Sequence, residues 1–136
     1  MLTLEIPGDI FERMVEQAKA EAPIEACGIL AGSDGKVEKL YTMTNIDQSR
    51  THCMMEPHEQ FAVIKDIRAA GLEMLAMYHS HPDTPARPSA EDIRLALTPD
   101  VIYVIVSLRN ADAPVIKGFL IKEGTITTVP IKVSNA

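Results

Sequence analysis

Apolar and polar positions near the N-terminus follow first the spacing of a strand and then the spacing of a helix. An apolar residue stands at every second position over residues 2–6, which predicts a short half-buried strand. From Ile10 to Ala18 the apolar residues recur at helical spacing, and Pro23 ends this pattern. Asp9 is the expected N-cap of the helix, with Glu12 three residues later.

The next segments predict a hairpin and a second helix. The segments 27–31 and 37–43 are typical of strands, and Gly32-Ser33-Asp34-Gly35, through which they are joined, is typical of a hairpin turn. A helix is expected from Pro57 to Gly71, because proline often begins a helix and glycine often ends one. We place Phe61, Ile64 and Ile67 on its apolar face.

The second half of the chain predicts one more helix and four more strands. The apolar run 74–79, bounded by Gly71 and Pro82, is short for a helix and predicts a buried strand. A short third helix is expected over residues 89–97. The remaining strands are expected at 101–108, 115–121 and 125–133. Three helices and about seven strands indicate an α+β or mixed α/β fold, a β-sheet sandwich flanked by helices, whose strand order the pattern leaves open.

Composition places the chain in the globular class. With 136 residues, of which 46% are hydrophobic and 24% charged, we expect a single domain over residues 1–136. The longest apolar runs, such as 101–106, fall far short of the roughly 20 residues of a membrane helix. The N-terminus shows no signal-peptide pattern. A membrane is therefore not expected as a partner.

Net charge and cysteine content bear on the expected partners and on the cellular compartment. The net charge is −6, and the chain has no basic stripe of the kind that neutralises phosphates, so nucleic acid is not an expected partner. Cys27 and Cys53 do not form a C-x-x-C pair, which argues against a disulfide scaffold and fits a reducing compartment. We expect a cytoplasmic protein; a homodimer stays possible on these grounds.

One stretch carries the spacing of a metal site. Because residues i and i+2 of a strand point to the same face, His79 and His81 present two imidazoles side by side. Pro82 ends that strand, so the pair is expected at a sheet edge or mouth. Asp92 lies one helical turn after Ser89, on the same side. Two imidazoles and one carboxylate leave a fourth position open, which is the composition of a catalytic zinc site.

These residues resemble the signature of a known family. The order His-Ser-His-Pro at 79–82, six further residues, then Ser-x-x-Asp at 89–92 is similar to the motif of the JAMM (MPN+) metalloproteases. The segment 23–32 resembles the family's second landmark, a glutamate before a Cys-Gly strand, and 55–57 resembles its acidic-proline step. The resemblance covers about residues 20–97, and the chain is most similar to the compact prokaryotic members.

The resemblance implies a fold, a cofactor and a reaction. The fold would be the cytidine-deaminase-like MPN/JAB fold. One zinc ion would be held by His79, His81 and Asp92, with Glu25 as general acid and base and Ser89 as stabiliser of the oxyanion. The substrate and partner would be a ubiquitin-like or sulfur-carrier protein, cut after its C-terminal diglycine. The chain has no long insertions of the kind that hold ubiquitin chains, which favours small carrier proteins.

Each site residue also has a plainer interpretation. His79 and His81 could be two strand histidines at the end of a sheet. Ser89 and Asp92 form a good capping box, which does not exclude catalysis. Glu25 could be a solvated loop carboxylate. Outside the motif, we expect the cysteines Cys27 and Cys53 to be structural and His52 and His58 to be surface or N-terminal helix residues. The methionines Met54, Met55, Met74 and Met77 are expected to fill the core.

Two other function classes stay open beside the zinc peptidase. The first is a catalytically silent MPN-type scaffold or protein-binding module, although such relatives typically lack one or more ligands and this chain has them all. The second is a RadC-like, DNA-repair-associated protein, which carries a related motif. That class has an added DNA-binding segment, and this acidic chain does not.

Overall fold

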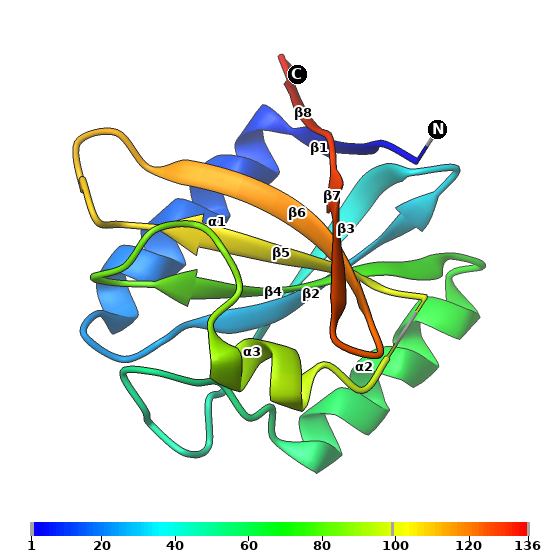
Figure 1. Cartoon of the computed structure of the whole chain (residues 1–136). Helices are drawn as coiled ribbons and strands as arrows, with labels where there is room; N and C mark the ends of the chain where they lie inside the picture. Colours follow the sequence, from blue (N-terminus) through cyan, green and yellow to red (C-terminus); the bar gives the residue numbers. More distant parts are fainter. Residues whose placement is uncertain (1, 99, 136) are drawn as a thin grey trace.

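A computed structural model describes residues 2–98 and 100–135. Within them the elements follow one another as β1 (Leu4–Pro7), α1 (Gly8–Glu21), β2 (Cys27–Ser33), β3 (Lys36–Met43), α2 (Pro57–Ala69), β4 (Glu73–His81), α3 (Ala90–Leu95), β5 (Ile102–Ser107), β6 (Val115–Lys122), β7 (Thr125–Val129) and β8 (Ile131–Ser134). The described strands form one mixed sheet in the order β7-β6-β5-β4-β2-β3-β1-β8 (Figure 1). This confirms the mixed α/β class. That residues 1–136 form a single domain stays a prediction.

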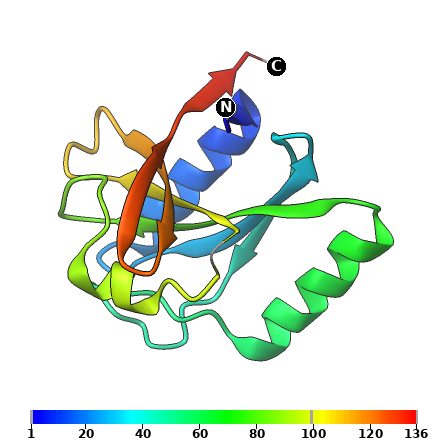
Figure 2. The ribbon, with the colours of Figure 1, turned by 45° about the vertical axis from the view of Figure 1, so that its right-hand side comes forward.

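Helices cover both faces of this sheet. Along β2, Leu30 packs in one apolar cluster with Ile10 and Met14 of α1, whereas Ile29 packs in another with Ile67 of α2. Because alternate strand residues point to opposite faces, α1 and α2 lie on opposite sides of the sheet. The third helix, α3, lies on the same side as α2 (Figures 1 and 2). None of the described helices has the length and apolar character needed to cross a membrane.

The first helix begins differently from the prediction. Its N-cap is Pro7, with φ −58° and ψ 144°, and no side chain caps it. The prediction that Asp9 is the N-cap is wrong, because β1 leads directly into the helix and Asp9 already lies in its first turn. There its carboxylate still favours the positive end of the helix dipole. Ile10, Met14 and Ala18 form the buried stripe, as the helical spacing predicts.

The predicted hairpin is confirmed, with longer strands and a tighter turn. Strands β2 and β3 pair antiparallel up to Ser33 and Lys36. Only Asp34 and Gly35 remain between them, and both have positive φ, 52° and 76°. Two consecutive residues with positive φ are the requirement of a type I′ hairpin turn, which aspartate followed by glycine meets at low cost.

Two predictions for later elements need correction. Phe61 was expected on the apolar face of α2, but its side chain is 62% exposed, and the buried side of this helix is centred on Ile67 with Val63 beside it. The expected strand 125–133 is two strands that break at Pro130, whose missing N–H cannot continue a ladder. After this break β8 leaves β7 and pairs parallel with β1 (Figure 2).

Strand β4 carries the histidine pair and lies near the middle of the sheet. It pairs antiparallel with β2, where His79 is level with Cys27, and parallel with β5, where His81 is level with Ser107. The two histidines are the alternate residues at its carboxyl end. The pair therefore lies at the mouth of a central strand rather than on an edge strand.

Candidate metal centre

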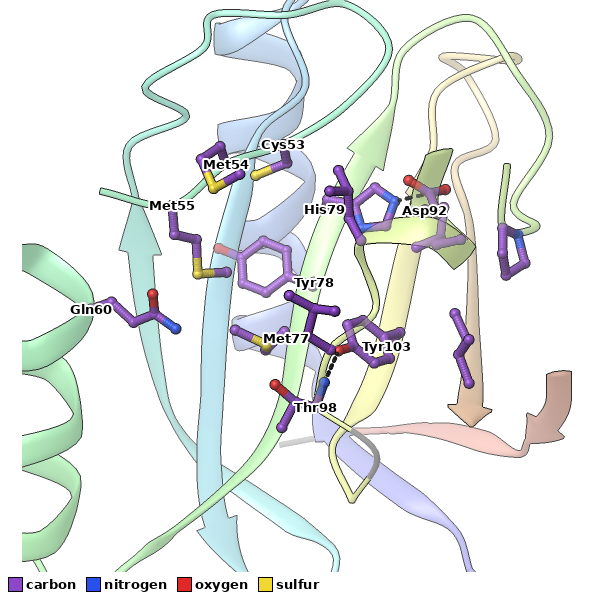
Figure 3. A pocket seen from close by; sticks show the side chains of 15 residues that line it. Cys53, Met54, Met55, Gln60, Met77, Tyr78, His79, Asp92, Thr98 and Tyr103 are labelled. Atoms are coloured by element: carbon purple, nitrogen blue, oxygen red, sulfur yellow. Dashed lines mark hydrogen bonds and ion pairs between the residues drawn. The ribbon is translucent and has the colours of Figure 1, made fainter. Parts of the chain in front are cut away.

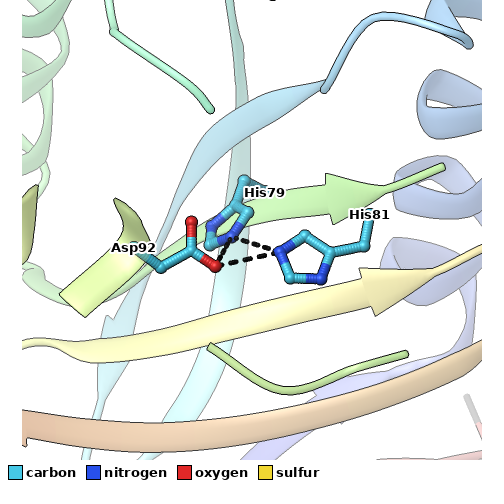
Figure 4. Close-up of side chains that lie close together, drawn as sticks. All are labelled: His79, His81 and Asp92. Atoms are coloured by element: carbon cyan, nitrogen blue, oxygen red, sulfur yellow. Dashed lines mark hydrogen bonds and ion pairs between the residues drawn. The ribbon is translucent and has the colours of Figure 1, made fainter. Parts of the chain in front are cut away.

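Three side chains from β4 and α3 converge on one point. The Nε2 atoms of His79 and His81 lie 3.2 Å apart. Oδ2 of Asp92 lies 3.2 Å from the first nitrogen and 2.9 Å from the second. All three side chains are largely buried, with exposed fractions of 12%, 4% and 7% for His79, His81 and Asp92 (Figure 4). Within the described part of the chain, this is the group of histidine, cysteine and acidic residues close enough to share a metal ion.

The spacing of these atoms fits a divalent cation. In a tetrahedral zinc site with bonds of about 2.0 Å, neighbouring ligand atoms lie about 3.3 Å apart. The observed separations of 2.9–3.2 Å come within a few tenths of an ångström of that value. Two imidazoles and one carboxylate also match the ligand types that zinc accepts at catalytic sites. The residues present therefore fit the zinc ion that the fold family implies.

The ring of His81 is oriented by the loop that follows it. Its Nδ1 lies 2.9 Å from the carbonyl oxygen of Pro85. Because a carbonyl oxygen only accepts, Nδ1 carries the proton, and in the neutral ring Nε2 keeps its lone pair towards His79 and Asp92. Such a hydrogen bond to the far nitrogen is how proteins set the orientation of ligating histidines.

The carboxylate of Asp92 is held by a capping box. The N–H of Ser89 donates to Oδ2 of Asp92 at 2.9 Å, and the N–H of Asp92 donates to Oγ of Ser89 at 3.0 Å. Burial alone would raise the pKa of Asp92, but the adjacent imidazoles of His79 and His81, together with the N–H of Ser89, outweigh it and hold that pKa far below its usual range. Asp92 is therefore ionised and ready to serve as a ligand. The capping box predicted for Ser89 is confirmed.

Glu25 is buried and lacks a partner for one oxygen. Its side chain is only 2% exposed, so the interpretation as a solvated loop carboxylate is wrong. Oε1 of Glu25 has no hydrogen-bond partner among the described residues. Burial raises the pKa of Glu25 to about 8; His81 opposes this shift and Asp92 adds to it. An unsatisfied buried oxygen is costly, which points to a ligand that the protein itself does not provide.

Hydrogen bonds between β4 and the residue after Glu25 bring this glutamate level with the histidines. The N–H of Ala26 donates to Oγ of Ser80 at 2.8 Å, and the N–H of Ser80 donates to the carbonyl of Ala26 at 2.9 Å. With Ala26 opposite Ser80, the next antiparallel pair is Glu25 and His81. Both of these residues are on the α2 side of the sheet, because they alternate with Ala26 and Ser80.

A cavity of about 280 Å³ opens beside this cluster. His79 and Asp92 lie at one end of it, while Thr98 and Tyr103 lie farther along (Figure 3). Its remaining wall is mostly apolar and consists of Cys53, Met54, Met55, Gln60, Met77, Tyr78, Pro88, Leu95, Leu97, Ile105 and Ile121. We call this cavity the apolar groove. One end of the apolar groove is thus formed by two of the three residues of the candidate metal centre.

Several residues of the apolar groove were not anticipated from the sequence. Met54, Met55 and Met77 were expected to fill the core, and all three line this groove, although Met55 also packs against the apolar cluster around Ile67. Met54 is 42% exposed and is therefore not a core residue. The segment around Met54 lies between a strand and a helix and has no periodicity that would show which way its side chains point. The only sequence feature that could have indicated a role for this segment at the site is its closeness to the Glu56-Pro57 step.

The two cysteines and the other two histidines show no sign of catalysis. Cys27 and Cys53 are free thiols. Contact with Cys27 and burial raise the pKa of Cys53, so this thiol stays protonated and is a poor nucleophile. His52 pairs with Asp47 at 2.9 Å, and His58 is 99% exposed and pairs with Glu56, as expected for surface residues.

A mixed sheet with two histidines at the mouth of its central strand, and an aspartate brought round by the next helix, defines the JAB/MPN class of domains. The chain matches the family model described as prokaryotic homologs of the JAB domain over residues 7–119. It therefore belongs to the compact prokaryotic branch of the JAMM/MPN family. This confirms the family resemblance seen in the sequence.

Similar proteins support this family assignment. The CysO-cysteine peptidase of Mycobacterium tuberculosis is 36% identical over 132 residues, which cover 96% of this chain and 90% of that protein. The desampylase of Haloferax volcanii is 35% identical over 95 residues, covering 68% of each chain. The first of these alignments covers nearly the whole chain.

Solved structures show the same fold. Protein DSY2949 from Desulfitobacterium hafniense superposes with a TM-score of 0.91 at 43% identity, covering 98% of this chain and 94% of that one. The JAB1/MPN domain protein AF2198 from Archaeoglobus fulgidus superposes with a TM-score of 0.62 at 20% identity, covering 95% and 97%. The second likeness supports the fold alone, and it agrees with the expected MPN/JAB architecture.

Proposed function

We propose that this protein is a zinc-dependent peptidase or isopeptidase that hydrolyses the bond after the C-terminal diglycine of a ubiquitin-like or sulfur-carrier protein. The names of its relatives, a CysO-cysteine peptidase and a desampylase, support this class of reaction. The observation that carries the proposal is the buried Glu25, whose Oε1 has no partner among the described residues and whose place in the ladder is level with His81, beside the convergent His79, His81 and Asp92.

His79 and His81, through Nε2, and Asp92, through Oδ2, would hold one zinc ion per chain. Zinc at such a site acidifies a water molecule and polarises a carbonyl group. Glu25 takes a proton from the attacking water while the oxygen of that water bonds to the scissile carbonyl carbon. Glu25 then delivers that proton to the nitrogen as the carbon–nitrogen bond breaks. A carboxyl group whose pKa is raised towards neutrality is suited to both transfers.

Ser89 is the proposed donor to the oxygen of the scissile carbonyl. Its Oγ already accepts the N–H of Asp92 at 3.0 Å, which fixes its position. A hydroxyl group can accept and donate at once, so its proton stays available for the developing negative charge. The cap and the catalytic role are therefore compatible in one side chain.

The apolar groove supports an extended protein tail as the substrate. The segment 53–55 forms part of its wall. The N–H of Met54 donates to Oδ1 of Asn45 at 3.1 Å, and the carbonyl of Met54 accepts from the N–H of Ile46 at 2.9 Å. Because backbone groups alternate along an extended segment, those of Cys53 and Met55 face away from Asn45 and can pair with a tail. Methionine side chains adapt to different apolar neighbours, which suits a tail with aliphatic residues before its diglycine.

The test compares two kinds of substrate with metal controlled. The protein is incubated with small carrier proteins fused through a C-terminal diglycine to an amino acid, and separately with di-ubiquitin, each with zinc and with a chelator. We expect zinc-dependent cleavage of the carrier fusions after the diglycine. Elemental analysis should give one zinc per chain. Failure to cut either substrate in the zinc-loaded state would reject the peptidase, and absence of bound metal would favour the silent scaffold.

A further inference from the structure

A single buried amide ties together four backbone groups near Glu25. Asn45, which follows β3, is 3% exposed. Its Nδ2 donates to the carbonyls of Glu25 and His52, at 3.0 Å each. Its Oδ1 accepts the N–H of Met54 at 3.1 Å and of Asp47 at 3.3 Å. Two donors and two acceptor positions are all that a carboxamide offers, so this side chain is saturated.

Hydrogen bonds of its backbone, rather than of its Oε1, hold Glu25 in place. Its Oε1 has no partner among the described residues, so that oxygen does not anchor the side chain. Its N–H donates to the carbonyl of Ser49 at 2.9 Å, and its carbonyl accepts from Asn45. Both backbone groups of Glu25 are therefore bound by the loop 44–56 between β3 and α2. On the other side, Ser80 of β4 holds Ala26.

The same loop forms one wall of the apolar groove. His52 and Met54, whose backbone groups Asn45 binds, flank Cys53, and Cys53, Met54 and Met55 line the groove. The N–H of Ile46 donates to the carbonyl of Met54 at 2.9 Å and completes a short two-stranded pairing. One side chain thus connects the backbone of the candidate base to the wall where a substrate tail would lie.

We propose that Asn45 is a positioning residue that holds the base Glu25 and the 53–55 wall of the apolar groove as one unit. This inference rests on the proposed peptidase function for Glu25. An amide is required because two of the four bound groups are carbonyl oxygens, which need a donor. In a carboxylate of the same shape, an acceptor oxygen would replace Nδ2 and leave both carbonyl oxygens unsatisfied.

The chain offers a matched control for this change. Nε2 of Gln17 donates to the carbonyl of Cys27 at 2.9 Å, and Oε1 of Gln17 accepts from the hydroxyl of Tyr78. Gln17→Glu therefore also removes an amide donor to a backbone carbonyl, two residues along from Glu25. Loss of this hydrogen bond from Gln17 does not involve the loop 44–56. Any general effect of weakening a contact to this part of the chain should appear equally in both variants.

Steady-state cleavage of the carrier fusion provides the first test. We expect Asn45→Asp to bind one zinc per chain yet to lose about 10²-fold in kcat, because a small displacement of a catalytic group has effects of this size. KM should rise in addition, since the wall of the groove is released. Gln17→Glu should stay within about twofold of wild type. Equal losses in both variants, or an unchanged kcat in Asn45→Asp, would overturn the positioning role.

A second measurement does not need turnover. Amide hydrogen exchange followed by NMR on the metal-free protein should be faster at both Glu25 and Met54 in Asn45→Asp and unchanged there in Gln17→Glu. If wild type cleaves no fusion, the proposed function fails, but exchange still decides whether Asn45 joins the two segments. Unchanged exchange at Glu25 and Met54 would reject that link, whatever the activity.

Discussion

Cys27 of β2 lies directly opposite His79 of β4 in the antiparallel ladder. This register fixes where the residue two positions before Cys27 must lie, because each step along one strand is matched by a step back along the other. Glu25 is thereby brought level with His81, on the same face of the sheet. The sequence separates these two residues widely, and a one-residue slip would move Glu25 to the opposite face.

Replacing Glu25 by glutamine tests its role directly. Glu25→Gln keeps the shape of the side chain and removes its ability to take a proton. We expect cleavage of the carrier fusion to fall by about 10²–10⁴-fold, the usual contribution of general acid–base catalysis. Zinc content, measured by elemental analysis, should stay at one per chain. Loss of zinc in this variant would mean that Glu25 is a ligand instead.

Removing a proposed ligand should uncouple stability from zinc. In wild type, zinc at about a thousand times its dissociation constant should stabilise the fold by roughly 4 kcal/mol, because it binds the folded state selectively. Asp92→Asn should largely abolish the rise in melting temperature on adding zinc. His58→Ala serves as the control, since His58 is 99% exposed and pairs with Glu56. An equal zinc response in wild type and Asp92→Asn would exclude Asp92 as a ligand.

The raised pKa of Glu25 predicts a pH dependence of stability. Burial raises this pKa from 4.5 to about 8, so the metal-free folded state holds the proton more tightly than the unfolded chain does. The stabilisation is complete below pH 4.5 and is lost as the pH rises through about 8. Between these limits the free energy of unfolding of wild type should fall by about 4 kcal/mol more than that of Glu25→Gln.

Denaturant unfolding of the metal-free proteins across this pH range provides the measurement. Asp92 stays ionised in both proteins across this range, so the difference between the two curves reports the proton on Glu25 together with its effect on the neighbouring His81. Zinc should reduce the difference, because a nearby cation favours the ionised carboxylate. Parallel curves for wild type and Glu25→Gln would show that burial does not shift this group.

Ser89 should contribute separately to stability and to turnover. Ser89→Ala removes the acceptor of the capping box and should cost about 1 kcal/mol in the free energy of unfolding. It should also lower kcat by about 10²-fold, the size of effect seen when an oxyanion donor is removed. Ser89→Thr retains both the acceptor and the hydroxyl, so it should recover most of each loss. A Ser89→Ala variant with reduced stability and full activity would leave Ser89 as a cap only.

The sequence predicted those features that depend on local spacing. The alternation of His79 and His81 and the capping box of Ser89 and Asp92 each involve residues within one turn or two strand positions. Their geometry follows from the secondary structure, and the convergence of the three side chains needs only a short, proline-rich loop. The hairpin was predictable for the same reason, because Asp34-Gly35 carries its own turn preference.

Features set by distant contacts were not predictable. Phe61 has the spacing of a buried residue, but α2 contacts the sheet through only a few of its residues. Tertiary packing decides which residues these are. The network around Asn45 depends on a loop folding back onto Glu25, and no periodicity marks it. Similarly, nothing near Pro130 shows that the chain leaves β7 there and crosses to β1.

This crossing has a consequence for how the protein folds. Strand β1 contacts β3 at a single matched position, but it pairs with β8 along its whole length. The first strand therefore obtains most of its ladder from residues that come 127 positions later in the sequence. On a ribosome, the sheet would remain open at this end until β8 has been synthesised, and closing so long a loop slows this step.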